Sequence, residues 1–123
     1  MRTLDTNALI YYLQGEPAVA RKFSSWRRVK EEFVVSTIVQ AELLSLPRLT
    51  DADRKEIEGL LATMLLVPVD APVAELAAAF RRTYRVKLLD TIIAATAFLR
   101  DVPLVTRNVK DFSRIREIQV ERI

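Results

Sequence analysis

The stretch FVVSTIVQAELLSLP, residues 33–47, is typical of a β-strand that leads directly into an α-helix. Phe33 to Val35 is an apolar, β-branched run, which favours a buried strand ending at Ser36-Thr37. From Ile38 onward apolar residues recur with helical spacing, until Pro47 stops the helix because it lacks a backbone N–H. A strand followed at once by a helix is the repeating unit of α/β folds.

The same alternation continues on both sides of this stretch. Further strands are predicted at residues 2–4, 65–69, 103–105 and, at the edge, 118–120. Helices are predicted at 8–13, from 16–17 to 29, at 38–46, from a Thr50/Asp53 capping box to 64, from 70–72 to 80, and at 92–99, the last buried on all sides. Strands that alternate with helices pair in parallel, so we expect an α/β fold: a three-layer α/β/α sandwich around a four- or five-stranded, mainly parallel sheet. At 123 residues, one domain spanning 1–123 is expected.

Composition restricts the chemistry that the protein can perform. The sequence has no Cys and no His, which excludes disulfides, thiolate nucleophiles, Ser-His-Asp triads and most zinc sites. Its net charge of +3 is compatible with an anionic partner without requiring one. No apolar run approaches the roughly 20 residues that a bilayer crossing needs. We therefore expect a cytoplasmic protein, without a membrane partner, whose chemistry depends on carboxylates, hydroxyls, Lys or Arg.

Several acids lie where the predicted strands end. Asp5 directly follows the first strand, and Glu42 lies in the helix after the second. Asp90 begins the buried helix, and Asn108 and Asp111 follow the fourth strand. In parallel sheets the functional cleft lies beyond the carboxyl ends of the strands. These acids are therefore the candidate site residues.

The apolar neighbours of Glu42 and Asp90 make both acids unusual. A carboxylate with little water around it must be paired, protonated or bound to a metal. If both side chains share a cleft with Asp5, three negative charges lie close together, which is costly unless a cation neutralises them. Oxygen ligands without His or Cys favour Mg²⁺ or Mn²⁺ over zinc.

Each acid also has a purely structural interpretation. Asp5 and Asp90 could be N-caps of the helices that follow them. Asp111 could lie three residues after an Asn108 N-cap in a short helix. Glu42 could form a buried ion pair with an Arg.

Four motifs are similar to those of a known family. LDTNALI at 4–10, QAELL at 40–44, LLDTIIAATA at 88–97 and LVTRNVKDF at 104–112 together resemble the PIN-domain ribonucleases. The resemblance is strongest to the VapC-type toxins of bacterial and archaeal toxin–antitoxin modules, and it spans nearly the whole chain in the family's order. It implies a compact α/β/α PIN fold and Mg²⁺- or Mn²⁺-dependent cleavage of RNA.

The resemblance also implies roles for individual residues. Asp5, Glu42 and Asp90 match the family's three acidic metal ligands, which would also be the catalytic residues. The family often has a fourth acid after the fourth strand, where this chain has Thr106-Arg107-Asn108. Either Asp111 supplies the fourth catalytic and metal-binding carboxylate, or Asn108 assists as a neutral ligand or supporting group. Candidates for hydrogen bonds that support the ligands are Thr6, Asn7 and Thr106.

Three partners are expected. Of the many basic residues, Arg107 and Lys87 are the first candidates for contacts with an RNA backbone, because they lie beside the proposed ligands in sequence. The resemblance implies an antitoxin that covers the cleft with a basic or aromatic segment. It also implies a homodimer, for which Tyr11, Tyr12 and Trp26 are candidate contacts.

Two other classes of protein are alternatives. One is a non-catalytic PIN-like module that binds RNA or protein, although the three principal acids are all retained. The other is a different Asp-centred α/β protein, such as an aspartyl phosphatase or a phosphoacceptor receiver domain. The phosphatase pattern requires a second Asp where this chain has Asn7, and a receiver places its acceptor after a later strand.

Overall fold

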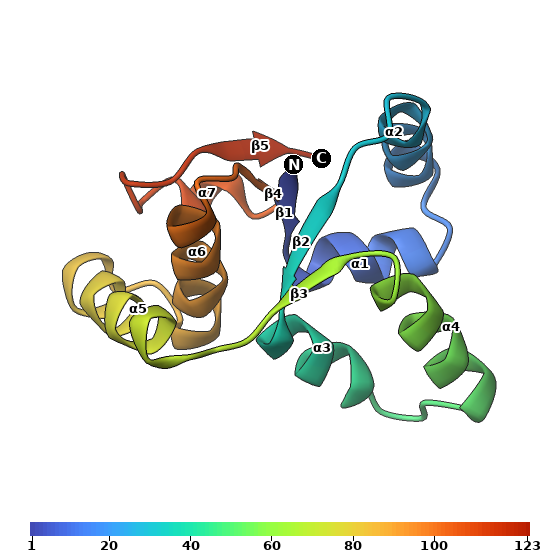
Figure 1. Cartoon of the computed structure of the whole chain (residues 1–123), viewed down its shortest axis with the longest axis horizontal. Helices are drawn as coiled ribbons and strands as arrows, with labels where there is room; N and C mark the ends of the chain where they lie inside the picture. Colours follow the sequence, from blue (N-terminus) through green and yellow to red (C-terminus); the bar gives the residue numbers. More distant parts are fainter.

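Five short strands form one parallel sheet in the order β3-β2-β1-β4-β5 (Figure 1). The computed structural model describes residues 1–123. The strands are β1 (Arg2–Leu4), β2 (Phe33–Ser36), β3 (Leu65–Val67), β4 (Leu104–Thr106) and β5 (Val120–Arg122). Every pairing is parallel, and in the central strand Thr3 lies opposite Val34 on one side and Leu104 on the other. The predicted parallel sheet is therefore confirmed, with five strands.

Seven helices cover the two faces of the sheet. They are α1 (Thr6–Leu13), α2 (Pro17–Arg28), α3 (Thr37–Leu44), α4 (Asp51–Leu61), α5 (Ala71–Tyr84), α6 (Leu88–Arg100) and α7 (Val109–Phe112). Figure 1 shows α1 to α4 on one side of the sheet and α5 to α7 on the other. From β1 to β3 the strands are added toward one edge of the sheet, and β4 and β5 are then added toward the other edge. Because crossovers between parallel strands are right-handed, the helices that connect the two sets of strands lie on opposite faces. The predicted three layers follow from this reversal.

Side-chain caps define where most helices begin. Asp5, Glu16, Ser36 and Asp70 each accept a backbone N–H at the start of α1, α2, α3 and α5. At α4 the predicted capping box is present, because the Thr50 hydroxyl and the Asp53 carboxylate bond to each other's backbone N–H. The Asp5 cap explains why α1 begins at Thr6 and not at Ala8 as predicted.

Some predicted boundaries are wrong. Helix α3 ends at Leu44 and not at Leu46, because a residue that precedes proline is disfavoured in helical geometry. The last strand is Val120–Arg122 and not 118–120, since its register with β4 pairs Val120 with Leu104. Helix α6 begins at Leu88, so Asp90 lies inside its first turn and does not cap it.

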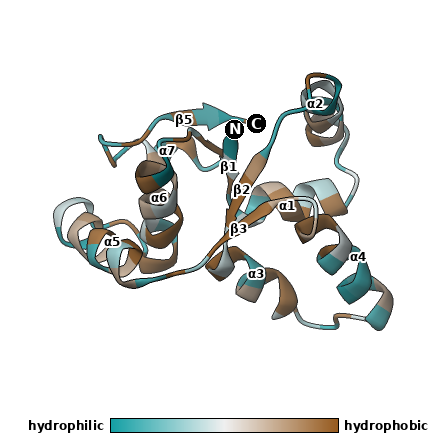
Figure 2. Ribbon diagram, viewed as in Figure 1, coloured by the Kyte–Doolittle hydropathy of each residue, from teal (hydrophilic) through white to brown (hydrophobic).

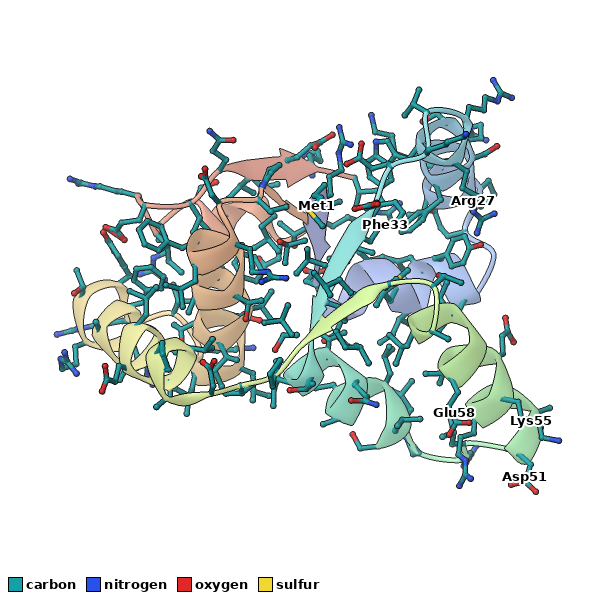
Figure 3. All side chains as sticks on the ribbon, viewed as in Figure 1. Met1, Arg27, Phe33, Asp51, Lys55 and Glu58 are labelled. Carbon is teal, nitrogen blue, oxygen red and sulfur yellow. The ribbon has the colours of Figure 1, made fainter.

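The hydrophobic core lies between the sheet and the two helix layers. Figure 2 shows apolar residues along the central strands, while the outer end of α4 is polar. On α4 the side chains of Asp51, Lys55 and Glu58 are all exposed, and Asp51 and Lys55 lie at its outer end (Figure 3). Helix α6 is buried only in its middle, because Phe98 and Leu99 at its end are 43% and 47% exposed, which corrects the prediction of complete burial.

An aromatic cluster joins α2 to the start of β2. The ring centroid of Phe23 lies 5.3 Å from those of both Trp26 and Phe33, and Phe33 lies between β2 and α2 (Figure 3). Trp26 is only 5% exposed, and Tyr11 and Tyr12 pack against the core. Trp26 is therefore a core residue and not an exposed dimer contact. None of the seven helices is both long enough and apolar enough to cross a lipid bilayer.

Candidate active site

The candidate site lies at the carboxyl ends of β1 and β4, where the direction of strand order reverses. Asp5 directly follows β1, and Thr106 is the last residue of β4. The Thr106 hydroxyl donates a hydrogen bond of 2.6 Å to Asp5 Oδ2, which joins the two strand ends. Ligands of open α/β sheets bind at such a reversal, because the loops on either side leave toward opposite faces and open a crevice.

Asp5 is buried, and each of its two carboxylate oxygens accepts one hydrogen bond. The residue is only 4% exposed. Its Oδ1 accepts a hydrogen bond of 2.8 Å from the Ala8 N–H, and its Oδ2 accepts one from the Thr106 hydroxyl. Burial raises the pKa of Asp5, the bonds from Thr106 and Ala8 oppose this, and the charge of Glu42 raises the pKa further. The structural and functional interpretations of Asp5 are therefore compatible: it caps α1 and also lies at the site.

Glu42 extends from α3 toward the same site. Its Oε1 accepts a hydrogen bond of 2.7 Å from the Thr6 hydroxyl, and it forms no ion pair. Glu42 is half-buried, whereas its apolar neighbours Val39 and Leu43 are fully buried in the core. Glu42 is therefore less dry than its apolar neighbours predict, and the alternative interpretation, a buried ion pair with an Arg, is excluded.

Asp90 approaches from the opposite helix layer, in the first turn of α6. The pKa of Asp90 is raised from 3.8 to about 6, first by burial and then by the charges of Asp5 and Glu42. Lys87 opposes this increase in pKa, and Asp111 adds to it. A carboxyl group with this pKa is protonated in part of the molecules near neutral pH.

The three acids line two cavities, which have volumes of about 300 and about 380 Å³. Both are lined by Asp5, Asn7, Glu42 and Asp90. The first is also lined by Thr6, Ile10, Ser45, Leu46 and Ile93, and the second by Lys87, Leu88, Leu89, Asn108 and Phe112. The fold therefore brings together three acids that are far apart in the sequence.

Asp111 lies at the margin of the site. Its Oδ2 accepts a hydrogen bond of 3.0 Å from the Asn108 side-chain amide, and its charge contributes to the raised pKa of Asp90. Asn108 lines the second cavity, and Asp111 lines neither. Asn108 occupies the N-cap position of α7, but its side chain makes no capping bond. The two candidates for the fourth position thus form a hydrogen-bonded pair.

The acids line the same cavities, but their side chains are not arranged as a set of ligands for one metal ion. No three carboxylates are grouped closely enough to hold one ion together. Asp5 and Glu42 are held by hydroxyl groups, and like charges repel one another when no cation lies between them. None of the four acids forms an ion pair with a Lys or Arg.

Of the two predicted RNA contacts, only Lys87 lies at the site. It lines the second cavity beside Asp90, whereas Arg107 lies outside both cavities and pairs with Glu16. Sequence reasoning missed Ser45, which lines the first cavity. A signal was present, because Ser45 follows Glu42 by three positions and residues at that spacing share a helix face.

Comparisons with known proteins agree with this geometry. Residues 3–118 match the family model described as PIN domain. Two curated relatives from Mycobacterium tuberculosis align over 97% of this chain: Ribonuclease VapC10, at 32% identity over 91% of its length, and Ribonuclease VapC19, at 29% over 98%. A toxin–antitoxin complex from Klebsiella pneumoniae contains a chain with 28% identity and a TM-score of 0.82, covering 96% of this chain and 95% of that one.

A further solved structure supports the fold alone. The crystal structure of VapBC2 from Rickettsia felis bound to a promoter DNA fragment has a TM-score of 0.84 at 21% identity, over 99% of this chain and 98% of that one. The matching family model, the curated relatives and the acids gathered at the carboxyl end of the sheet lead to one conclusion. This chain belongs to the PIN domain family.

Proposed function

We propose that this protein is a divalent-metal-dependent endoribonuclease that acts as the toxin of a type II toxin–antitoxin system. The observation that carries the proposal is the arrangement of Asp5, Glu42 and Asp90, which come from three separate elements and line shared cavities with no cation paired to them. The names of the curated relatives support ribonuclease activity. An RNA-cleaving toxin of this kind would act in the cytoplasm.

The donor set fits Mg²⁺ or Mn²⁺. Carboxylate oxygens are the ligands that these hard cations prefer. The pKa of Asp90 is raised first by burial and then by the charges of Asp5 and Glu42, and a cation would offset those charges. Asp5, Glu42 and Asp90 would hold the ion, with Asp111 or Asn108 beside them. Side chains would have to turn toward one another on binding, because the acids do not form a ready cluster. A bound divalent ion supplies Lewis acidity, which activates water and offsets charge on the scissile phosphate.

The protein's own residues position and deprotonate the attacking water. Asp5 is held on both carboxylate oxygens, by Ala8 and Thr106, so it provides a rigid oxygen at the base of the site. Asp90 lies on the wall of both cavities and would accept the proton of the attacking water. Neither His nor a covalent nucleophile is needed for phosphodiester hydrolysis by this route. The resemblance to the PIN-domain ribonucleases implies products that carry a 5′-phosphate and a 3′-hydroxyl.

The RNA would approach along the second cavity. Lys87 lies on its wall as a cation for a phosphate, and Leu88 and Leu89, at 54% and 42% exposed, provide an apolar surface beside it. Exposed apolar side chains next to a charged site can contact the faces of unstacked bases. Asn7 is exposed between the two cavities and can hydrogen-bond to a base or a phosphate.

An antitoxin would bind beside the site. A groove of about 220 Å³ shares Ile10 and Leu46 with the first cavity. It is lined mainly by apolar residues and by the acids Asp53 and Glu56. A basic and apolar antitoxin segment would complement this groove and continue into the acidic cavity. The solved toxin–antitoxin complex of the Klebsiella pneumoniae relative supports such a partner. A homodimer is also proposed, and sedimentation of the isolated protein would test it.

The decisive experiment measures cleavage of a panel of structured RNAs with Mg²⁺, with Mn²⁺ and with EDTA. Wild-type protein should cleave with either ion and stop with EDTA. Glu42→Gln keeps an acceptor for the Thr6 hydroxyl but removes the charge, and it should lose activity by at least about a hundredfold. Glu75→Gln, an exposed acid on α5, is the matched control and should remain active. RNA binding without cleavage by the wild type would instead indicate a non-catalytic PIN-like module.

A further inference from the structure

Arg107, in the loop after β4, makes three contacts with residues that line neither cavity. Its Nη2 lies 2.5 Å from Glu16 Oε2, and its guanidinium carbon lies 4.5 Å from the centroid of the Tyr11 ring. Its Nε donates to the Ile123 carbonyl oxygen at 3.3 Å. These partners belong to the α1–α2 junction, to α1 and to the residue after β5, so one side chain joins three segments that are distant in sequence.

The Glu16 side chain is itself oriented by two hydrogen bonds from backbone N–H groups, so Arg107 pairs with a carboxylate whose position is already set. Its Oε2 accepts the Val19 N–H at 3.0 Å and its Oε1 accepts the Ala18 N–H at 3.3 Å, as the cap of α2. The side chains of Glu16 and Arg107 are 30% and 35% exposed. A partly buried pair whose acid is already oriented loses less side-chain entropy than an ordinary surface pair.

The residues on either side of Arg107 hold the acids of the site. Thr106 donates to Asp5 Oδ2, and the Asn108 N–H donates to the Thr106 hydroxyl at 2.9 Å. The Asn108 side chain donates to Asp111. Any shift in the loop 106–108 would therefore change the Thr106–Asp5 bond and the Asn108–Asp111 bond together.

We propose that Arg107 is a positioning residue of the site: through Glu16, Tyr11 and Ile123 it fixes the loop 106–108, and thereby the Thr106 and Asn108 side chains that orient Asp5 and Asp111. The proposal builds on the endoribonuclease function proposed above. It assigns Arg107 a role other than binding the RNA backbone. Small displacements of the groups around the reacting atoms lower the reaction rate, because catalysis depends on the geometry of these groups.

The sign of the Glu16 effect separates positioning from RNA binding. If Arg107 bound a phosphate, removing the negative charge of Glu16 would leave Arg107 freer and would improve RNA binding. If Arg107 positions the loop, removing Glu16 must impair cleavage just as removing Arg107 does. Glu16→Gln retains a side-chain oxygen for the α2 cap, so the variant tests the ion pair more than the helix.

The experiment compares the wild type, Glu16→Gln, Arg107→Gln and the double variant. Steady-state cleavage of one RNA substrate is measured with Mg²⁺, and hydrogen exchange of the Asn108 amide is measured without metal. We expect each single variant to lose about tenfold in kcat with KM within about twofold, and the double variant to be no worse than either. Asn108 amide exchange should accelerate in all three. Arg107→Lys, which keeps the charge, should recover part of kcat, and Arg114→Gln, an exposed neighbour, should change neither quantity.

Other outcomes overturn the proposal. A higher KM and an unchanged kcat in Arg107→Gln, with a neutral or improved Glu16→Gln, would make Arg107 an RNA contact. Unchanged Asn108 exchange in both single variants would show that the ion pair does not hold the loop. If the wild type cleaves no RNA, the proposed function fails, while accelerated Asn108 exchange would still support the positioning of the loop and unchanged exchange would refute it.

Discussion

Acidic side chains are paired with cations at the amino end of the parallel sheet but not at its carboxyl end. At the amino end, Glu31 pairs with the Met1 ammonium at 2.5 Å and with Arg2 at 2.7 Å, and Arg2 also pairs with Glu121 at 2.9 Å. The Arg2 guanidinium lies 4.8 Å from the centroid of the Trp26 ring. Every acid in this network has a cation beside it.

At the carboxyl end, three of the four acids bond to hydroxyl and amide groups instead. Asp5 accepts from Thr106, Glu42 from Thr6, and Asp111 from Asn108. The pKa values shift in opposite directions as a result: the Met1 ammonium lowers the pKa of Glu31, whereas burial raises the pKa of Asp5. The amino end stabilises the fold, and the carboxyl end retains unneutralised charge at the expense of stability, which is expected of a functional site.

Removing the most buried acid of the carboxyl end should have the largest effect on activity. Asp5→Asn is expected to lower RNA cleavage roughly a thousandfold, because it removes the central proposed ligand. Thermal unfolding should show a melting temperature equal to or above that of the wild type, since the variant no longer buries a carboxylate. Full activity in a folded Asp5→Asn protein would refute the site assignment.

The hydroxyl that holds Asp5 should have the next largest effect. Thr106→Val preserves shape but removes the donor to Asp5 Oδ2, so we expect cleavage to fall about thirtyfold. Stability should fall by about 1–2 kcal/mol, because a buried carboxylate oxygen loses its partner. Wild-type activity and melting temperature would show that this bond matters little.

The fourth position can be resolved by comparing its two candidates. Asp111→Asn is expected to lower kcat about tenfold, because its charge acts on Asp90, while Asn108→Ala should have a smaller effect. Mn²⁺ titration of both variants would measure the loss of affinity directly. The opposite order of effects would assign the fourth position to Asn108.

The two ends should also differ in the sign of their effect on stability. The folded-state pKa of Asp90, about 6, lies above its ordinary value of 3.8, so the folded protein binds the proton more tightly. The stability that Asp90 contributes is therefore fully present below pH 3.8 and is lost as pH rises through 6. Metal-free Asp90→Asn should be more stable than wild type at pH 7 by about 1 kcal/mol, after allowing for solvent screening, and equal to it near pH 3.5. Chemical denaturation in EDTA at both pH values measures this.

The smallest effect is expected at the amino end. Glu121→Gln removes one partly exposed ion pair with Arg2, so it should destabilise the fold by roughly 0.5 kcal/mol and leave cleavage unchanged. The same denaturation experiment would detect it. Stabilisation by Glu121→Gln would contradict the contrast between the two ends.

Much of the architecture could be predicted because it depends on near neighbours in the chain. The Thr50/Asp53 capping box and the β-branched run at 33–35 both became the elements that they predict. The position of Asp5 was also predicted correctly, since a polar residue directly after a buried parallel strand must lie at the carboxyl edge of the sheet.

Other features could not be predicted, because they depend on contacts between distant residues. Glu42 appeared dry from its apolar neighbours, yet those neighbours point into the core and leave its own side chain on a cavity wall. Arg107 appeared to be an RNA contact from its place in the sequence, yet it pairs with Glu16. Neither outcome has a local signal.

The sequence by itself determined the α/β class, the order of elements, and the absence of His and Cys that limits the site to oxygen ligands. Only the tertiary structure decided which acids are neutralised and which are not. Periodicity and capping are set by interactions within a few residues, whereas the burial of Asp5, the raised pKa of Asp90 and the partner of Arg107 arise where strands and helices from both faces of the sheet meet.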